Sequence, residues 1–362
     1  MSLQATPFHA RAVEANRFNV WENRRGYTLA RYYENAAEEA LVARFGAVMG
    51  DLSWHWRAEF SGGDVEAFVA RAFTRNGARL AENEACEVLW LNDGGAVRGR
   101  GILLRLARDR FLLSAAEEDR DWLFFAAGLY GVCARDHTSD GVLALIGPYA
   151  EEILLAAELS NIPAPMMLRR QSWRGLEIAI SRLGIGFEIW CEADIALIVW
   201  DRLQAAGAPF ALLPAGQEAL DTLSFECGLL LPGRDFAPAR DGFVAEPSLT
   251  ALGLFGLVDA GAHYNGKTGA PARGLCGLVL DGPAEPGPVT FAGRSLGQLL
   301  ACRYSPALQA VIGLAVLEPG EIPQGLSIGH LSCRAVALPF LPLSEPILGF
   351  SGAATETAAS TV

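Results

Sequence analysis

The sequence is short of lysine, of paired metal ligands and of long apolar runs. Among its 29 basic residues only Lys267 is a lysine, and 41 acidic residues leave a formal net charge of −12. Because phosphate contacts need a basic face, and no run of basic residues provides one, nucleic acid is not expected as a partner. The five histidines lie at no helical or zinc-finger spacing from one another, so we expect no metal site.

The cysteines and the apolar segments exclude two further classes of protein. Seven cysteines are spread so that no two lie within four residues of each other, which is neither a disulfide framework nor a zinc-finger pattern. Residues 141–159 form a strongly apolar run, but a Gly-Pro pair and two glutamates interrupt it, and the other apolar runs are too short to span a membrane. The N-terminus has no apolar core typical of a signal peptide. We therefore expect a cytoplasmic protein with no membrane partner.

Two short motifs match known sites in their letters but not in their context. Residues 261–268, GAHYNGKT, spell the phosphate-binding P-loop, but Gly269 and Pro271 follow where a helix would have to begin. Residues 325–329, GLSIG, spell the nucleophile elbow of hydrolases, but a strand-like segment follows instead of a helix. We interpret the first motif as a surface loop and the second as a turn that enters a strand.

The order of the predicted elements indicates an α+β fold with antiparallel sheets. Helical spacing at 36–47, 64–74 and 117–131 alternates with strands at 51–62 and 86–115. A strand followed by a helix occurs at 141–159 and again at 186–208, and 214–233 is a helix that leads into a turn. From about residue 275, short strands separated by Gly and Pro predict a small terminal β-barrel or sandwich. We expect the small, polar tail at 351–362 to be disordered.

The segment SWHW, residues 53–56, carries two indoles and a histidine in alternation. On a strand, Trp54 and Trp56 would share one face, and Ser53 and His55 the other. The two indoles fit either a hydrophobic core or a wall on which a flat heterocycle stacks. The sequence alone leaves both interpretations open.

Three charged residues lie in predicted strands. Glu188 lies in the apolar strand 186–191, where an inward carboxylate is costly without hydrogen-bond donors, whereas on the solvent face of an edge strand it would need none. The aminopyrimidine of a pterin would supply two N–H donors. Arg98 and Arg100 follow the turn 92–95, and they are either solvated or aimed into a cleft at an anionic group.

Several segments together resemble the aminomethyltransferase family, which comprises the glycine cleavage T-protein and its relatives. The resemblance runs almost from end to end, and PAGQEALDTLSFECGLLLPGRD (214–235), against the family's PAG…DTL…E.GL…G.D pattern, is its most specific part. Details such as the GFEIW segment resemble the folate-dependent demethylases, including dimethylsulfoniopropionate demethylase and aromatic O-demethylases. The other matching segments are ATPFHARAVEANRF (5–18), DLSWHW (51–56), SGGDVEAFVARAFTRN (61–76), GFEIWCEADIALIVWDRLQAAGAPF (186–210) and GQLLACRYSPALQAVIGLAVL (297–317).

The resemblance implies a three-domain ring of the T-protein type around a central funnel for tetrahydrofolate, with a small C-terminal β-barrel. The implied division has a discontinuous first α+β domain at 1–48 plus 137–200 and a second α+β domain at 49–136. A helical and connecting part of the folate-binding core follows at 201–274, and the barrel occupies 275–350. Lys267 would take a basic position in the approach to the barrel, facing either the glutamate tail of a folate or solvent.

The resemblance also implies roles for individual residues. Glu188 corresponds to the glutamate that holds the pterin, and Trp56 and Trp190 would complete the tetrahydrofolate site. We expect Arg100 and His55 to act on the donor as catalytic residues. The expected substrate-binding residues are Trp54, Arg98, Tyr32 and Tyr33.

One departure from the family bears on the reaction. Where the family pattern VIDD carries an acid that assists aminomethyl transfer, this chain has Arg98, Gly99, Arg100 and Gly101. We therefore expect a tetrahydrofolate-dependent methyltransferase or demethylase that acts on a small methylated donor. Aminomethyl transfer of the T-protein kind and a non-catalytic folate-binding protein are the alternatives.

Overall fold

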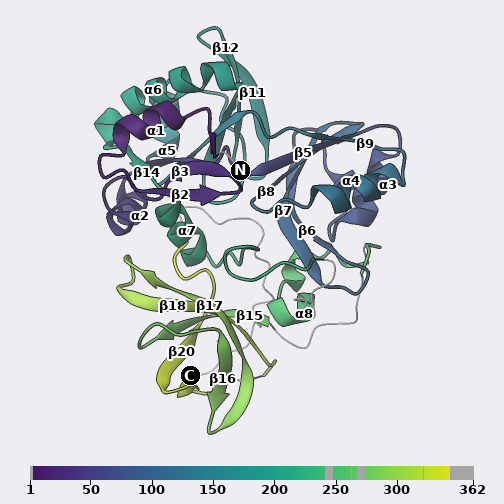
Figure 1. The fold of residues 1–362 in the computed structure, drawn as a ribbon, viewed down its shortest axis with the longest axis vertical. Coiled ribbons are helices and arrows are strands. Elements are labelled where there is room, and N and C mark those ends of the chain that lie inside the picture. The colour runs from purple at the N-terminus through teal and green to yellow at the C-terminus, as the bar shows by residue number, and fades with distance from the viewer. Residues whose placement is uncertain (1–2, 241–247, 262, 267–273, 321, 343–362) are drawn as a thin grey trace, which may run out of the picture.

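The computed structural model describes residues 3–240, 248–261, 263–266, 274–320 and 322–342. They form three lobes: two lobes that each contain a large sheet lie side by side, and a barrel lies below them (Figure 1). Lys267 and the tail 351–362 lie outside the described residues. No helix in the described part of the chain is long and apolar enough to cross a membrane.

The first lobe is built on a six-stranded sheet with the order β11-β12-β13-β10-β4-β14. Apart from the parallel pair β4 and β14, its neighbouring strands are antiparallel. A small sheet, β1-β3-β2, completes the lobe. The bounds are β1 (Gln4–Ala5), β2 (Trp21–Arg24), β3 (Tyr27–Ala30), β4 (Val48–Asp51), β10 (Gly141–Ile146), β11 (Leu168–Trp173), β12 (Leu176–Ser181), β13 (Phe187–Cys191) and β14 (Leu213–Ala215).

Helices α1 (His9–Ala15), α5 (Ala150–Ala156) and α6 (Ala196–Gly207) pack on one another in this lobe. Their apolar side chains form a continuous core with the strands, in which Phe8, Met49, Leu143, Ile180 and Trp200 are buried. Helix α2 (Ala36–Phe45) begins at Asn35, whose side chain accepts from the backbone N–H groups of residues 37 and 38, as expected for an N-cap.

The second lobe is a five-stranded antiparallel sheet with the order β6-β7-β8-β5-β9. Helices α3 (Val65–Ala72) and α4 (Arg120–Gly128) bury their apolar side chains against it, and Phe60, Phe68, Trp90 and Leu113 are fully buried there. The strand bounds are β5 (Trp56–Ser61), β6 (Ala85–Leu91), β7 (Val97–Ala107), β8 (Arg110–Ala115) and β9 (Cys133–Asp136).

The third lobe is a closed six-stranded barrel. Closure removes the exposed strand edges that a short-stranded sheet would otherwise present. Helix α7 (Gln217–Glu226) lies between the barrel and the first lobe. The short α8 (Leu249–Leu252) lies between the barrel and the second lobe (Figure 1). The barrel strands are β15 (Gly274–Leu280), β16 (Gly287–Phe291), β17 (Arg294–Ser305), β18 (Ala310–Leu317), β19 (Leu326–Ile328) and β20 (Leu331–Val336).

The predicted α+β class, the antiparallel sheets and the terminal barrel are confirmed, and the motif at 325–329 is part of a strand–turn–strand unit. The domain limits stay predictions. Three elements cross the expected limits: β4 (Val48–Asp51) and α6 (Ala196–Gly207) both belong to the first lobe, and β15 (Gly274–Leu280) begins one residue before the predicted barrel.

The chain crosses between the two large sheets twice, at residues 52–55 and 137–140. The expected single strand at 51–62 is therefore wrong, because β4 ends at Asp51 in one sheet and β5 begins at Trp56 in the other. The fully buried Arg57 ties the two crossings together, since its guanidinium donates to the carbonyls of Ser53 at 3.1 Å, Thr138 at 2.9 Å and Asp140 at 2.8 Å. This clamp fixes the distance between the sheets.

Candidate functional site

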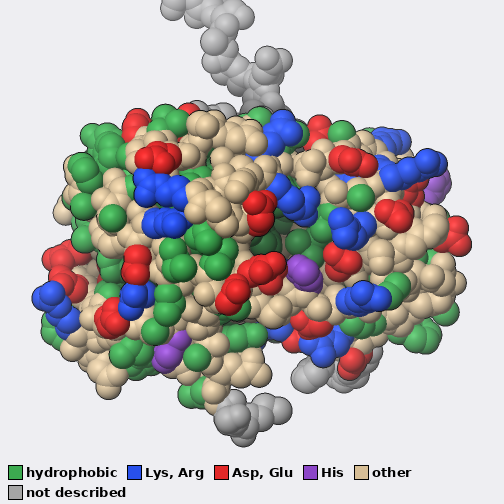
Figure 2. Space-filling view, turned by 90° about the horizontal axis from the view of Figure 1, so that it is seen from above, with side chains coloured by type: hydrophobic (Ala, Val, Ile, Leu, Met, Phe, Trp, Pro, Cys, Tyr) green, Lys and Arg blue, Asp and Glu red, His purple; other side chains and the backbone are tan. Residues whose placement is uncertain are grey.

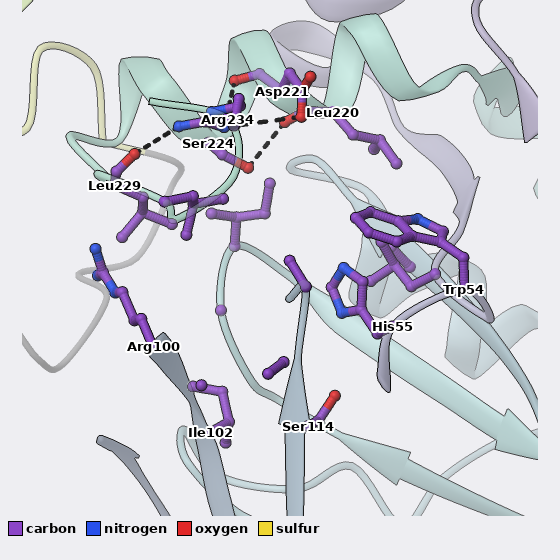
Figure 3. Close-up of a pocket in the computed structure, with 18 of the residues that line it drawn as sticks. Trp54, His55, Arg100, Ile102, Ser114, Leu220, Asp221, Ser224, Leu229 and Arg234 are labelled. Atoms are coloured by element: carbon purple, nitrogen blue, oxygen red, sulfur yellow. Dashed lines mark hydrogen bonds and ion pairs between the residues drawn. The ribbon is translucent and has the colours of Figure 1, made fainter. Parts of the chain in front are cut away.

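A cavity of about 470 Å³ lies between the two sheet lobes and under α7 (Figure 3). A space of this size fits a cofactor or a drug-sized ligand. Viewed from above, the surface is hollowed near its middle, and side chains of both charges surround the apolar hollow (Figure 2). The residues on which the argument depends are Arg24, Arg25, Trp54, His55, Glu87, Arg100, Gly101, Glu117, Glu188, Asp221, Ser224, Gly233 and Arg234.

The first crossing brings Trp54 and His55 into the cavity together. The turn at 52–55 breaks the alternation expected of a strand, and the backbone N–H of His55 donates to the carbonyl of Leu52. The two rings meet edge to face with 4.6 Å between their centres, and both line the cavity. The indole N–H of Trp54 donates to Gln217 of α7 at 2.9 Å, which fixes the plane of the ring.

Trp56 does not reach the cavity, and its prediction as a folate-pocket residue is wrong in this structure. As the first residue of β5 it is fully buried in the core of the second lobe, with its ring 6.3 Å from that of Phe124. Of the two interpretations of the indoles, each therefore applies to one residue: Trp56 belongs to a core and Trp54 to a wall of the cavity.

Glu188 lines the cavity from β13, which is an interior strand between β12 and β10. The interpretation as an edge-strand residue is therefore excluded. Ser181, opposite it on β12, donates to its carboxylate at 3.4 Å. Burial raises the pKa of Glu188 to about 7, although the guanidinium of Arg57 and this hydrogen bond oppose the rise.

Trp190 supports this carboxylate without lining the cavity itself. Its side chain is buried, and its indole N–H donates to the hydroxyl of Ser181 at 2.8 Å. The prediction that Trp190 forms a wall for the cofactor is therefore corrected: it orients the serine that bonds Glu188. The guanidinium of Arg57 lies over its ring at 5.6 Å.

Arg98 and Arg100 are both buried on β7, so neither is a solvated arginine. Arg100 lines the cavity, and its guanidinium donates to Glu87 of β6 at 2.5 Å and to the carbonyl of Leu230 at 2.6 Å. Arg98 does not line the cavity, which corrects its prediction as a substrate-binding residue. It forms two hydrogen bonds of 2.8 Å with Asp119, at the beginning of α4.

The predicted tyrosines are also placed away from the cavity. Tyr33 is buried in the core of the first lobe, and Tyr32 is half-buried; neither lines the cavity. The N-terminal segment instead contributes the hairpin between β2 and β3, which presents Arg24 and Arg25. The letters NRRG at 23–26, typical of a tight turn that carries two cations, were the available signal for them.

A cluster of arginines surrounds Asp221 on α7 and joins the first lobe to the barrel. Arg24 donates to the Asp221 carboxylate at 3.0 and 2.7 Å, and Arg234 and the barrel residue Arg303 each lie 3.8 Å from it. Ser224, one helical turn further along α7, is also on the cavity wall and donates to the carbonyl of Leu220 (Figure 3). Sequence reasoning missed this cluster because its members lie far apart along the chain.

The protonation of His55 is governed by its surroundings. Burial, together with the guanidinium groups of Arg57, Arg24 and Arg25, lowers its pKa to about 3. The imidazole is therefore neutral at physiological pH and can accept or donate a hydrogen bond, but it cannot serve as a cation. Glu117, on the loop between β8 and α4, has a pKa raised by burial.

Comparison with known proteins identifies the family. The family model described as "GCVT N-terminal domain" matches residues 8–248. The chain belongs to the aminomethyltransferase family. An aminomethyltransferase of Frankia alni is 30% identical over 345 residues, covering 88% of this chain and 91% of the relative. An aminomethyltransferase of Bacillus pumilus is 27% identical over 347 residues, covering 87% of this chain and 93% of the relative.

A solved structure supports the fold of this aminomethyltransferase family member. The glycine cleavage system aminomethyltransferase T of Bartonella henselae superposes with a TM-score of 0.79 at 22% identity, covering 94% of this chain and 99% of the other. The predicted T-protein type of fold is thus confirmed. Similarity to the demethylases in particular stays a prediction.

Two of the residues on β7 that differ from the family pattern, Gly99 and Gly101, have no room for a side chain. A Cβ at Gly101 would lie 2.6 Å from the carbonyl oxygen of Ser114, and one at Gly99 would lie 2.0 Å from the ring of Trp90. Neither position accepts a side chain without a shift of its neighbours. Arg100, between them, points its guanidinium to Glu87, so the carboxylate that pairs with this arginine comes from β6.

Proposed function

We propose that this protein is a tetrahydrofolate-dependent one-carbon transferase whose reaction takes place in the cavity between the two sheets. The observation that carries the proposal is Glu188. It places a carboxylate on the cavity wall of an otherwise apolar strand, and its only hydrogen bond from a described residue is the 3.4 Å contact with Ser181. A carboxylate in such a place is costly without further donors.

The residues present fit the pterin of a folate. The two N–H donors of an aminopyrimidine match the unused acceptor positions of Glu188. The indole of Trp54, held by Gln217, and the apolar side chains Leu52, Leu183 and Ile185 supply flat and apolar walls. When bound, tetrahydrofolate supplies a nucleophilic amine nitrogen that accepts the one-carbon unit.

The protein's own contribution is orientation and exclusion of water. Glu188 would bind the N–H groups of the pterin, and Trp54 and His55, which line the same cavity, would limit its movement. Two reactants held in this way react as if they were at very high concentration, so positioning alone supplies much of the rate. The neutral imidazole of His55 offers a hydrogen bond to the donor without adding a charge.

Two donors follow from different observations. The names of the relatives favour an aminomethyl group, which the carboxylates of the cavity would help to transfer, and this is the first candidate. Arg100 in the place of the family acid favours the second candidate, a plain methyl group on a good leaving group, because such a transfer needs less acid–base help. A small donor with a carboxylate of its own would suit the arginines around the cavity.

One experiment tests the proposal and separates the donors. The protein is incubated with tetrahydrofolate and either an aminomethylated lipoyl protein or a panel of methylated small molecules, and the folate is analysed by mass spectrometry. Methylene-tetrahydrofolate supports the first candidate, and 5-methyl-tetrahydrofolate supports the second. If tetrahydrofolate does not bind, or binds equally well to wild-type and Glu188→Ala protein, the proposed site is wrong.

A further inference from the structure

The loop between β8 and α4 carries three consecutive acids, Glu117, Glu118 and Asp119, with three different environments. Asp119 is buried and bound by Arg98 and by the indole N–H of Trp90 at 2.9 Å. Glu118 is paired with Arg25. Glu117 lines the cavity, its nearest cation among the described residues is Arg240 at 4.0 Å, and it accepts no hydrogen bond from them.

Glu117 is held against the cavity wall by its neighbours. Gly233 has a φ of +78°, and a Cβ there would lie 2.2 Å from the Glu117 carboxylate oxygen, so the carboxylate packs directly on the backbone of the opposite loop. Arg240 donates to the carbonyls of Arg98 at 2.8 Å and Glu118 at 3.2 Å, which ties the loop to β7. The position of Glu117 is thus set by contacts on both sides.

The other carboxylates of the cavity wall are already engaged. Glu87 is bound by Arg100, and Asp221 by Arg24. A guanidinium partner favours the ionised form of a carboxylate and makes it a poor proton carrier. Glu188 lies at the proposed pterin site. Glu117 is the wall carboxylate that accepts no hydrogen bond from the described residues, and its ion-pair partner Arg240 lies 4.0 Å away. Burial outweighs the guanidinium groups of Arg240 and Arg25 and raises the pKa of Glu117 above its ordinary value.

We propose that Glu117 is the proton-transferring group of this cavity and replaces the acid that the family carries on the strand where this chain has Arg100. The proposal rests on the proposed one-carbon transfer. As the amine nitrogen forms its bond to the one-carbon unit, the bond between that unit and the leaving atom breaks, and its electron pair stays with the leaving atom. The Glu117 carboxylate accepts the proton that the nitrogen loses and delivers it to the leaving atom.

For the aminomethyl donor the step occurs twice, because methylene-tetrahydrofolate joins the carbon to two nitrogens: the C–S and C–N bonds break, two folate N–H protons are lost, and the departing sulfur and amine nitrogen gain them. For the methyl donor it occurs once, and a departing atom that leaves as an anion takes up the proton. The arginines at the family's acid position then have a positioning role. Arg98 holds Asp119, two residues beyond Glu117, and the backbone of Arg98 accepts from Arg240, which also bonds the loop. The residues that stand in place of the acid on β7 thus help to hold the loop that carries Glu117.

The test compares Glu117→Gln with Glu117→Asp and with the control Asp121→Asn, an exposed residue at the start of α4. In single-turnover reactions we expect Glu117→Gln to lower the rate at least 100-fold and to keep the tetrahydrofolate Kd within about threefold, as is typical of the loss of a general acid–base group. Glu117→Asp should recover part of the rate, and Asp121→Asn all of it. The pH dependence that Glu117 imposes on the wild-type rate should be absent in Glu117→Gln.

A readout without folate completes the test. Carboxyl ¹³C NMR of the free protein should show a glutamate that titrates above its ordinary pKa and that disappears in Glu117→Gln but not in Glu188→Gln. If the wild type transfers a one-carbon unit and Glu117→Gln does so within threefold of its rate and with the same pH profile, the Glu117 proposal is wrong and the proposed function stands. If the wild type transfers nothing from either donor, both are wrong.

Discussion

The two walls of the cavity compensate their charges in opposite ways. On the first-lobe wall, the Glu188 carboxylate has a single 3.4 Å hydrogen bond from Ser181 and keeps its remaining acceptor positions open. On the second-lobe wall, Arg100 is bound to Glu87, and behind that wall Arg98 is bound to Asp119. The open acceptor positions of the first wall can accept hydrogen bonds from a ligand. The guanidinium groups of the second wall are bound by the protein's own carboxylates. Under the proposed function, the first wall would bind the folate, whereas the proton transfer would depend on a loop of the second lobe.

The largest expected effect concerns the second wall, whose buried ion pair should hold its shape. Asp119→Ala removes the buried carboxylate that bonds both Arg98 and the indole N–H of Trp90, and breaking a buried pair in this way costs about 3–5 kcal/mol. Urea denaturation of the variant should show this loss in the free energy of unfolding. The control Asp121→Ala removes an exposed acid from the same helix start and should cost less than about 1 kcal/mol. Equal stability of the two variants would contradict the structural role of the pair.

The next effect concerns the first wall, where Glu188→Gln keeps the shape and removes the charge. We expect the Kd for tetrahydrofolate to rise about 10- to 100-fold, because hydrogen bonds to a charged acceptor are worth about 1.5–3 kcal/mol. Isothermal titration calorimetry measures the change directly. Gln217→Glu is not a suitable control, because it would add a charge on α7. The control is Glu177→Gln, which removes the same charge from an exposed residue of β12 that does not touch the cavity.

The same variant carries a pH test. The pKa of Glu188 is raised to about 7 in the folded protein, above the 4.5 of an ordinary glutamate. The stability of the folded protein therefore falls as the pH rises above 4.5. It stops falling above pH 7, where the folded carboxylate is also ionised. Relative to Glu188→Gln, the ligand-free wild type should lose on the order of 2 kcal/mol of stability between pH 5 and pH 8. An identical pH profile for both proteins would show that the first wall does not strain its carboxylate.

The sequence predicted these two walls unequally, for physical reasons. Glu188 was found because a carboxylate inside an apolar strand is a local anomaly. Trp54 and His55 were found, but on an assumed strand, because the alternation in SWHW conceals the turn in which the chain changes sheets. Glu117 lies in an acidic run that looks like an ordinary helix start, and only the approach of Gly233, 116 residues later, makes it part of the cavity. Contacts of that kind are absent from any local pattern.

A last prediction sharpens the comparison at the crossings that join the walls, because each crossing carries one histidine. His55, in the first, faces the cavity and has a pKa lowered to about 3 by burial and by three nearby guanidinium groups. His137, in the second, lies on the surface 3.2 Å from Asp140, which raises its pKa.

We expect proton NMR of the free protein to show His137 titrating above 6.5, and the His55 ring signals unchanged between pH 8 and pH 5. His55 is protonated below pH 6.5 only in the unfolded chain, so His55→Gln should reduce the loss of stability on acidification. His137 is protonated more readily in the folded protein, so His137→Gln should slightly lower the stability below pH 6.5. A titration of His55 near pH 6.5 would mean that the cavity is wetter and less cationic at the first crossing than the arrangement of Arg24, Arg25 and Arg57 requires.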